Sequence, residues 1–577
     1  MASIPIRPVL LTCGIANNHP VVVKHSGKKY DVEVDPESTG ETFKFQLYSL
    51  TGVEPERQKV LMRGGPLKDD ADMSKFGLKA GQTIMMMGTP GEGAATLERP
   101  KEAVKFAEDM TEAELAQQEG ATPAGLQNLG NTCYMNSTLQ TLRAIPELQN
   151  ALTKYEPAPA NAITGTLPQL DLTRQLRDLW KYMGETQDAV VPHAFLSALR
   201  TAYPQFAERS RSGPGFAQQD AEEAWSQIIS QIRSKVKTKN GAEASDSSFI
   251  DTYMAGEFSS KLECDEPAAK EAGEEPVVTK DPFLKLNCHI DSSTNHLTDG
   301  IRNGLIEKIE KKSDALGREA TYTRSSKISR LPKYLAVHFV RFFWKRETQK
   351  KAKIMRKVVF PHELDVVEFC NEHLAKMLIP VRDKVREIRK DEEDIERARK
   401  RRKKNDGQAA LEDIPGGMGA KLDKKDAKPD KKEEKKAADG DVEMGETYKT
   451  DAEIDAEKDA GLLAAKKELH DLIHPDLAKD DGANQSGLYE LRGVVTHQGA
   501  SADSGHYTAY VKKLGTVDAK TGKKKEEDGN WWWFNDDKVS EVTPDKIEAL
   551  AGGGESHSAL ILLYKAIPLP SAEGIVE

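Results

Sequence analysis

The sequence predicts an α+β protein with two folded units and a long charged insertion in the second unit. In residues 21–88, short β patterns flank one amphipathic helix. From residue 121 onward, helical apolar periods come first and β patterns follow, and blocks of Lys, Arg, Asp and Glu interrupt them at residues 381–485. The second unit is therefore expected to place a helical lobe against a sheet.

Composition argues against several classes of protein. The chain has 577 residues, of which 31% are charged and 38% apolar, so part of it is expected to remain unpacked. A net charge of −10 argues against a general nucleic-acid binder. The five cysteines are odd in number and widely spaced, which suits a reducing compartment, and no run approaches the roughly 20 apolar residues of a membrane span. We expect a cytoplasmic and nuclear protein with no membrane segment.

After an extension at residues 1–20, residues 21–88 are expected to form a sheet with one helix across it. The expected elements are a hairpin of Val21–His25 and Tyr30–Val34, a helix carrying Phe43, Leu47 and Leu50, and strands at Arg57–Met62 and Thr83–Met87. This order resembles the ubiquitin β-grasp fold, and Lys59–Leu67 and Met73–Leu78 resemble ubiquitin's third strand and the segment after it. The resemblance implies a docking module; an unrelated small α+β module is the alternative.

Residues 89–120 are expected to form a linker with a short helix. The stretch Gly125–Leu142 then passes from a turn rich in Gly and Asn into a helical period, with Cys133 at the expected helix start. Free backbone N–H groups at a helix start stabilise a thiolate. Asn128 in the turn is a candidate donor to an oxyanion. Taken alone, a cysteine in this position is more often a small buried hydrophobic residue.

A candidate base lies far along the chain. Residues 487–497 and 506–511 alternate as two strands around a loop, and His506 lies at the mouth of the second strand. Gly505 beside it is expected to leave room for a substrate backbone. His506 is therefore the candidate general base, whereas His497 is interpreted as a surface or hydrogen-bonded histidine.

The aromatic run that starts at Trp531 ends in Asn535 and Asp536. A strand beside that of His506 would bring its end against the imidazole. Because neighbouring strand residues point to opposite faces, only one of the two side chains is expected to orient His506.

Three stretches resemble the ubiquitin-specific proteases. Gly125–Ser137 resembles their cysteine box, and Gly505–Val511 with Trp532–Ser540 resembles their histidine box. The resemblance implies a papain-like domain of thumb, palm and fingers over residues 121–567, followed by a tail at 568–577. It implies a thiol-dependent ubiquitinyl hydrolase whose third catalytic member is Asn535, with Asp536 as runner-up.

Substrate-binding residues are expected in two places. Gln219, Asp220 and Glu223 resemble the family's helix beside the groove for the ubiquitin tail, although Asp220 as an N-cap with Glu223 three residues on also explains them structurally. Gly505 and Tyr507 are the other candidates.

The family commonly binds zinc through two Cys-x-x-Cys pairs in the region that follows. Here Cys264 and Cys288 are isolated, so the four ligands of tetrahedral zinc are missing. No metal and no cofactor is therefore expected.

Residues 381–485 are expected to be mostly disordered with transient helices, because alternating charge blocks bury too little surface. The basic run Arg397–Lys404 is interpreted as a solvated tract, with nuclear import or nucleic-acid binding as alternatives.

The domain order resembles the proteasome-associated branch of the family. This implies that the ubiquitin-like domain binds the regulatory particle of the 26S proteasome. It also implies that the free enzyme has low activity because loops block the groove, with residues 498–505 as one candidate blocker. A ubiquitin-binding proteasome regulator without catalysis is the second hypothesis.

Overall fold

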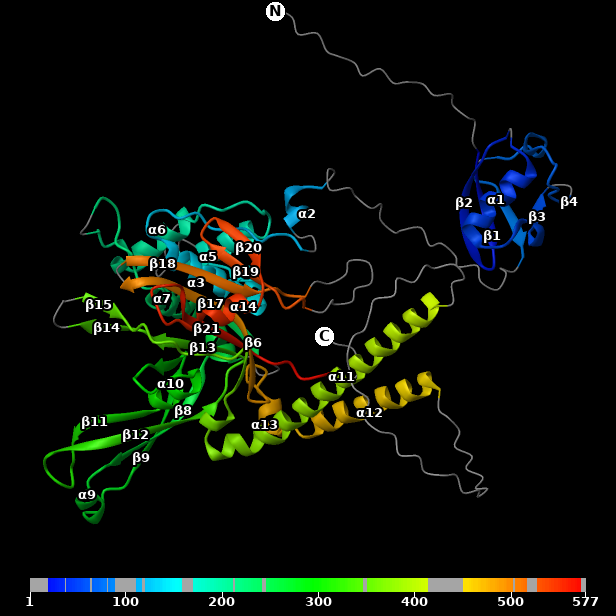
Figure 1. Cartoon of the computed structure of the whole chain (residues 1–577). Coiled ribbons are helices and arrows are strands. Elements are labelled where there is room, and N and C mark those ends of the chain that lie inside the picture. The colour runs from blue at the N-terminus through cyan, green and yellow to red at the C-terminus, as the bar shows by residue number, and fades with distance from the viewer. Residues whose placement is uncertain are drawn as a thin grey trace, which may run out of the picture. The chain divides into compact units, whose positions relative to one another are not determined.

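The structure, a computed structural model, describes residues 19–88 (except 37, 63, 64 and 80), 110–116, 120–157, 170–210, 213–240, 245–345, 350–412, 450–501, 504–515 and 527–571. The chain divides into two compact units, Met1–Asp109 and Met110–Glu577, shown with their element labels in Figure 1. Most of the expected extension, linker and tail lies outside the described residues. The short helix expected in the linker is α2 (Glu112–Ala116), and it belongs to the second unit, where Gln187 donates to the carbonyl of Leu115 at 3.0 Å.

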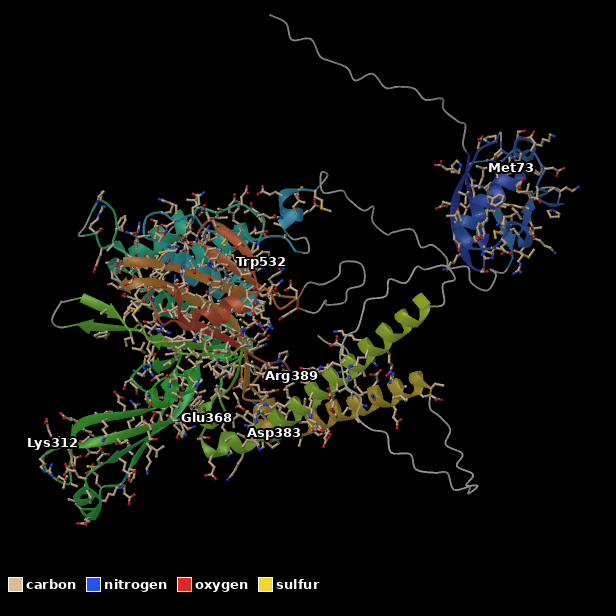
Figure 2. All side chains as sticks on the ribbon, in the orientation of Figure 1. Met73, Lys312, Glu368, Asp383, Arg389 and Trp532 are labelled. Carbon is tan, nitrogen blue, oxygen red and sulfur yellow. The ribbon has the colours of Figure 1, made fainter. Side chains whose placement is uncertain are left out.

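The first unit is a five-stranded sheet in the order β2-β1-β5-β3-β4. Alternate strand residues point inward and pack on the buried stripe of the helix, which includes Phe43 and Leu47, while Met73 (1% exposed; Figure 2) closes the core. The sequence-based elements of this unit are confirmed, except that the strand expected from Arg57 begins at Lys59, because Pro55–Arg57 form a 3-10 turn. The bounds are β1 (His19–His25), β2 (Lys28–Val34), α1 (Gly40–Thr51), β3 (Lys59–Met62), β4 (Gly65–Pro66) and β5 (Thr83–Met87), with short 3-10 turns at Pro55–Arg57 and Met73–Phe76.

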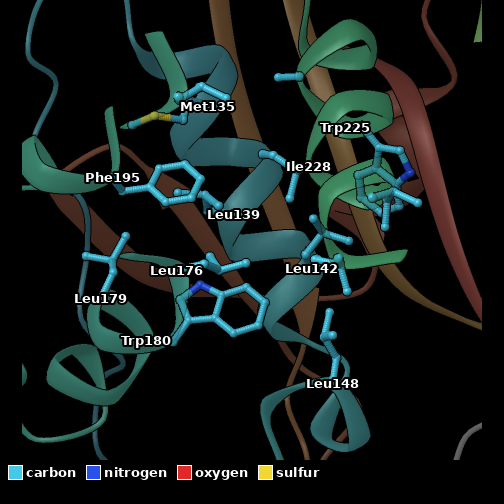
Figure 3. Packing of buried hydrophobic residues seen from close by; sticks show 14 of the residues in the cluster. Met135, Leu139, Leu142, Leu148, Leu176, Leu179, Trp180, Phe195, Trp225 and Ile228 are labelled. Carbon is cyan, nitrogen blue, oxygen red and sulfur yellow. The ribbon is translucent and has the colours of Figure 1, made fainter. Parts of the chain in front are cut away.

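A helical layer opens the second unit, with α3 at its centre. Every residue of α3 from the cysteine at its start to Leu142 is buried. Figure 3 shows Leu139 and Leu142 among side chains of the surrounding helices, including Trp180 and Ile228. The bounds are α3 (Cys133–Arg143), α4 (Pro146–Thr153), α5 (Leu172–Met183), α6 (His193–Ala202), α7 (Ala221–Lys235) and α8 (Phe249–Tyr253).

A ten-stranded sheet faces this layer, and its main path runs β10-β13-β21-β17-β18-β19-β20. Helix α3 packs on β17 and β18, which fixes the helix start against the hairpin that carries His506. The path strands are β10 (Leu286–His289), β13 (Tyr334–Val340), β17 (Leu488–Ser501), β18 (Ser504–Lys512), β19 (Trp531–Asn535), β20 (Lys538–Val542) and β21 (Ser558–Ala566). The others are β14 (Phe342–Lys345), β15 (Lys350–Lys353) and β16 (Glu363–Asp365).

One sequence-based expectation for this sheet is wrong. Residues 498–501 and 504–505 are strand and not loop: β17 continues to Ser501 and β18 resumes at Ser504, with a register shift between Gln498 and Ser501. Residues 358–361 form one isolated bridge, Val359 with His296, beside the start of α10.

A four-stranded sheet in the order β11-β12-β8-β9 projects from the large sheet, with Lys312 at the end of β11 (Figure 2). Its strands are β8 (Gly256–Cys264), β9 (Val277–Phe283), β11 (Ile306–Lys312) and β12 (Glu319–Arg330). The remaining elements are β6 (Lys237–Asn240), β7 (Ser245–Ser248), α9 (Pro267–Glu271), α10 (Leu297–Gly304), α13 (Pro475–Ala478) and α14 (Asp545–Glu548). Helical layer, large sheet and projecting sheet match the expected thumb, palm and fingers.

The expectation for residues 381–485 is wrong at both ends. Helices α11 (Glu372–Glu412) and α12 (Asp451–Asp471) lie side by side (Figure 1). At their base, Val385 and Ile388 are buried against Leu469. Residues 413–449 lie outside the described residues. Ion pairs also join the helices: Lys384 with Glu468 at the base, and Lys466 with Glu392, Arg399 with Asp459 and Arg402 with Asp455 further out, while Arg389 (Figure 2) binds Glu363 of β16.

Candidate active site

Cys133 is the first residue of α3, as the sequence predicts. The preceding turn is held against the β19–β20 turn, where the backbone N–H of Leu126 donates to the carbonyl of Asp536 at 2.9 Å. Gly125 is required there, since a β carbon would lie 2.6 Å from the carbonyl oxygen of Asp537. The cysteine box thus contacts the end of the histidine box directly.

Asn535 is the residue that bonds to His506. Its Oδ1 lies 2.6 Å from Nε2 of the imidazole, so Nε2 carries the donated proton and Nδ1 is left for a second partner. Asn535 ends β19, which pairs with the strand of His506. Of the two candidates, the structure brings Asn535 and not Asp536 to the imidazole.

Asp536 instead holds two asparagines of the cysteine box. Its Oδ2 accepts from Nδ2 of Asn128 at 2.9 Å, and its Oδ1 accepts from Nδ2 of Asn136 at 2.8 Å. The Oδ1 of Asn128 accepts from the backbone N–H groups of Gly130 and Thr132, which fixes the orientation of its amide. Asp536 has a φ of 54°, in the left-handed region that Asp and Asn tolerate best after Gly.

The thiol is not paired with the base. Within the described part of the chain, Cys133 makes no hydrogen bond to either ring nitrogen of His506. Burial raises the pKa of the Cys133 thiol to about 11, and the nearby carboxylate of Asp536 adds to this, although a hydrogen bond from the backbone N–H of Tyr507 opposes it. The helix-start N–H groups expected to stabilise a thiolate are outweighed by desolvation.

Two candidate substrate-binding residues have other roles. Gly505 has a φ of 129°, and a β carbon there would lie 2.1 Å from the carbonyl oxygen of Gln498 and 2.7 Å from Nε2 of His497. It therefore allows the hairpin to close, and the space beside it is filled by the chain itself. The side chain of Tyr507 is 1% exposed and packs in the core, because it points to the opposite face of β18 from His506.

His497 is not a surface histidine. It is fully buried, and its ring lies against those of Tyr507 and Phe342. Burial lowers its pKa to about 3, with a further contribution from Lys353. Its neutral imidazole acts as a core aromatic residue.

The acidic residues at the start of α7 act partly as a helix cap. Oδ1 of Asp220 accepts from the backbone N–H of Glu222 at 2.9 Å, while Glu223 completes no capping box. Glu222 pairs with Lys285. Three side chains at the amino-terminal end of α7 are half-buried: Gln219, Asp220 and Glu223.

Cys264 is the last residue of β8, and Cys288 lies in β10. Cys264 and Cys288 each donate to a backbone carbonyl at 3.8 Å and are buried. Across the described ranges, no three His, Cys, Asp or Glu side chains are grouped as metal ligands, and no helix is long and apolar enough to cross a membrane.

Sequence reasoning missed two members of the site. Asn136 follows Cys133 by three residues and faces the same turn, a helical spacing that could have marked it. His557 lies with its ring centroid 6.4 Å from that of His506. No motif marked His557, because it comes just before β21, far from both boxes in sequence.

Comparisons with known proteins agree with this architecture. The profile of the family described as ubiquitin carboxyl-terminal hydrolase matches residues 124–564, and that of the ubiquitin family matches residues 21–91. The chain is 43% identical over 547 residues to ubiquitin carboxyl-terminal hydrolase 6 of Schizosaccharomyces pombe, which covers 95% of this chain and 98% of the relative.

Two further relatives span similar lengths. Ubiquitin carboxyl-terminal hydrolase 6 of Arabidopsis thaliana is 38% identical over 95% of this chain and 98% of its own. Ubiquitin carboxyl-terminal hydrolase 14 of Caenorhabditis elegans is 31% identical over 95% of this chain and 93% of its own. The chain therefore belongs to the ubiquitin carboxyl-terminal hydrolase family, as a cysteine-type deubiquitinase with an amino-terminal ubiquitin-like domain.

Proposed function

We propose that the chain cleaves the isopeptide bond after the carboxyl-terminal glycine of ubiquitin, with Cys133 as nucleophile and His506 as general base. The observation that carries this assignment is the junction of the two boxes, where His506 bonds to Asn535 at 2.6 Å and the adjacent Asp536 bonds to Asn128 at 2.9 Å. The β19–β20 turn thus holds both the general base and the oxyanion donor. Both lie beside the helix that starts with the nucleophile.

The reaction follows from these positions. His506 takes the proton of the Cys133 thiol, and the thiolate attacks the carbonyl carbon of the glycine. Nδ2 of Asn128 and the backbone N–H of Cys133 donate to the oxyanion. The C–N bond breaks as His506 gives its proton to the leaving lysine amine, which leaves a thioester. Water, deprotonated by His506, then hydrolyses the thioester and restores the thiol.

The resting enzyme is proposed to be weakly active. A thiol whose pKa is raised to about 11 is almost wholly protonated at neutral pH, and it lacks a hydrogen bond to the base. The hairpin β14–β15 reaches the tip of the catalytic hairpin, where Ala352 pairs with Ser501. Movement of this tip is the proposed step that aligns the thiol with His506.

A ubiquitin-based electrophilic probe tests the assignment. Covalent capture at Cys133, lost in Cys133→Ala, is expected, with stronger capture when 26S proteasome is present. No capture even with proteasome would instead support the second candidate, a ubiquitin-binding regulator without catalysis, which the neutral Asn535 and a thiol not bonded to His506 favour. Equal hydrolysis of a ubiquitin reporter by free and proteasome-bound enzyme would contradict the resting-state proposal alone.

The ubiquitin-like domain is proposed to dock the enzyme on the regulatory particle of the proteasome. Its sheet face opposite α1 exposes Leu61 (41%), Met85 (56%) and Met87 (50%), and Leu61 pairs directly with Met85 across β3 and β5. Clustered exposed apolar side chains on a small domain mark an interaction surface.

A pair of exposed substitutions tests this docking face. Met85→Asp is expected to weaken co-purification with proteasome at least tenfold, since an interface centre excludes charge. Phe45→Asp is the matched control, because Phe45 is 53% exposed on α1. Equal retention of both variants would argue against this face.

A further inference from the structure

His557 lies beside the proposed general base without belonging to either sequence box. The centroids of the His557 and His506 rings are 6.4 Å apart, and their planes are inclined at 72°, an edge-to-face arrangement. His557 is the last residue before β21, on a segment tied to the catalytic hairpin by the backbone N–H of Gly499, which donates to the carbonyl of Glu555 at 3.0 Å. The ring thus approaches His506 from an element separate from the hairpin and from β19.

One threonine hydroxyl contacts the His557 ring, and a second threonine supports the first. Its Nδ1 lies 3.1 Å from Oγ1 of Thr496, which lies 2.8 Å from Oγ1 of Thr508. Both threonines are buried, and they pair across β17 and β18. Thr508 is two residues from His506 on the same face of β18. The ring is therefore anchored to the strand that carries the base.

The groups around His557 keep it uncharged. The titratable groups that face it are His506 from β18, His497 from β17 and Lys353 from β15. Burial, together with the neighbouring His506 and Lys353, lowers the pKa of His557 to about 4. A neutral ring can contact an imidazolium without charge repulsion, whereas a cation at this distance would disfavour the imidazolium.

A single hydrogen bond fixes one atom of a ring and leaves rotation about that point. We propose that His557 is a positioning residue for His506, an inference that rests on the proposed function. The anchored ring of His557 restricts this rotation of His506, while Asn535 holds Nε2 of His506. The Nδ1 of His506 then stays available for the Cys133 thiol when the site aligns. This role requires a ring at residue 557, and it requires that the ring carry no charge. Substitutions that change the ring and the charge separately therefore distinguish the two requirements.

The test compares His557→Ala, His557→Phe and His557→Lys in the full chain bound to proteasome, from about pH 5.5 to about pH 9, with a ubiquitin–aminocoumarin reporter. His557→Ala is expected to lower kcat roughly tenfold with little change in KM, because the base loses orientation but ubiquitin binding does not. His557→Phe keeps a ring and should retain kcat within about threefold of wild type. His557→Lys should move the limb of the kcat/KM profile that reports His506 to lower pH by about one unit.

Two controls accompany these variants. His373→Ala changes an exposed histidine of α11 and is expected to match wild type. Melting temperature reports whether each variant is folded. Probe labelling of Cys133 tests the proposed function. If wild type fails to label, the proposed function fails whatever residue 557 does.

Two results would overturn the positioning role while labelling persists. One is wild-type kcat and an unshifted pH profile in both His557→Ala and His557→Lys. The other is loss of activity in His557→Ala and His557→Phe alike, in proportion to melting temperature and with no shift in His557→Lys, which would make His557 a purely structural residue.

Discussion

The two sides of the candidate site differ in how far they are assembled. On the side of the β19–β20 turn, every functional side chain has a partner: His506 bonds to Asn535, and Asp536 bonds to Asn128 and Asn136. On the side of α3, the thiol of Cys133 is buried, its pKa is raised, and it has no bond to the base. Orientation and nucleophile activation are therefore separate properties, and only the first is built into the resting fold.

The physical reason lies in what each side needs. Amides and a carboxylate can be fixed by hydrogen bonds between neutral or singly charged groups at little desolvation cost. A buried thiolate needs a compensating imidazolium, and without it the neutral thiol is the stable form. Activation is therefore expected to change the α3 side and leave the turn unchanged.

The largest expected effect is on thiol reactivity in the free enzyme. Because a raised pKa keeps the proton on sulfur below about pH 11, alkylation of Cys133 by iodoacetamide should accelerate about tenfold per pH unit, or about a hundredfold from about pH 7 to about pH 9. Peptide-resolved mass spectrometry measures Cys133 separately from the other cysteines. A flat profile would show that an ion pair already exists and would remove the contrast between the two sides.

The next effect concerns the turn. In Asp536→Asn an NH2 group replaces one carboxylate oxygen, so the side chain can accept from only one of Asn128 and Asn136; the oxyanion donor is then held less firmly and kcat should fall about thirtyfold to a hundredfold. Asparagine tolerates the φ of 54°, so the backbone should be retained. Kinetics with a ubiquitin reporter measure the change.

Asp537→Asn is the matched control for this variant, since Asp537 is the exposed neighbour in the same turn. The carboxylate of Asp536 also raises the pKa of Cys133, so Asp536→Asn should slow catalysis while slightly accelerating alkylation. Parallel loss of both would instead indicate local unfolding of the turn.

Local sequence patterns predicted the parts of the site that lie inside elements. The helical period after Cys133 placed the first residue of α3 correctly, whereas the alternation around His506 predicted its strand but not its start, since β18 begins at Ser504. Whether Asn535 or Asp536 meets the imidazole depends on where β19 stops and turns. The desolvation of Cys133 and the burial of His497 depend on residues of other elements that pack against them. No local sequence pattern shows those contacts.

The prediction of disorder fails for helices α11 and α12, where a local helical pattern is present but total charge was given more weight. Val381, Val385 and Ile388 follow a helical period, but the surrounding charges conceal it, and their partner Leu469 is distant in sequence. The composition rule for disorder weighs total charge, whereas three or four well-spaced apolar residues suffice to seat a helix pair on a folded domain.

The smallest expected effect links the two sides through residue 535. In Asn535→Asp the acceptor of the His506 bond gains a negative charge, which stabilises the imidazolium and hence the imidazolium–thiolate pair. Alkylation of Cys133 at neutral pH should increase roughly threefold to tenfold, with a smaller change in kcat because orientation is already provided. Asn535→Ala, which loses both charge and orientation, should lower kcat without this gain. If Asn535→Asp leaves alkylation unchanged, the base does not reach the thiol in the resting state at all, and only movement of the β17–β18 tip can join the two sides.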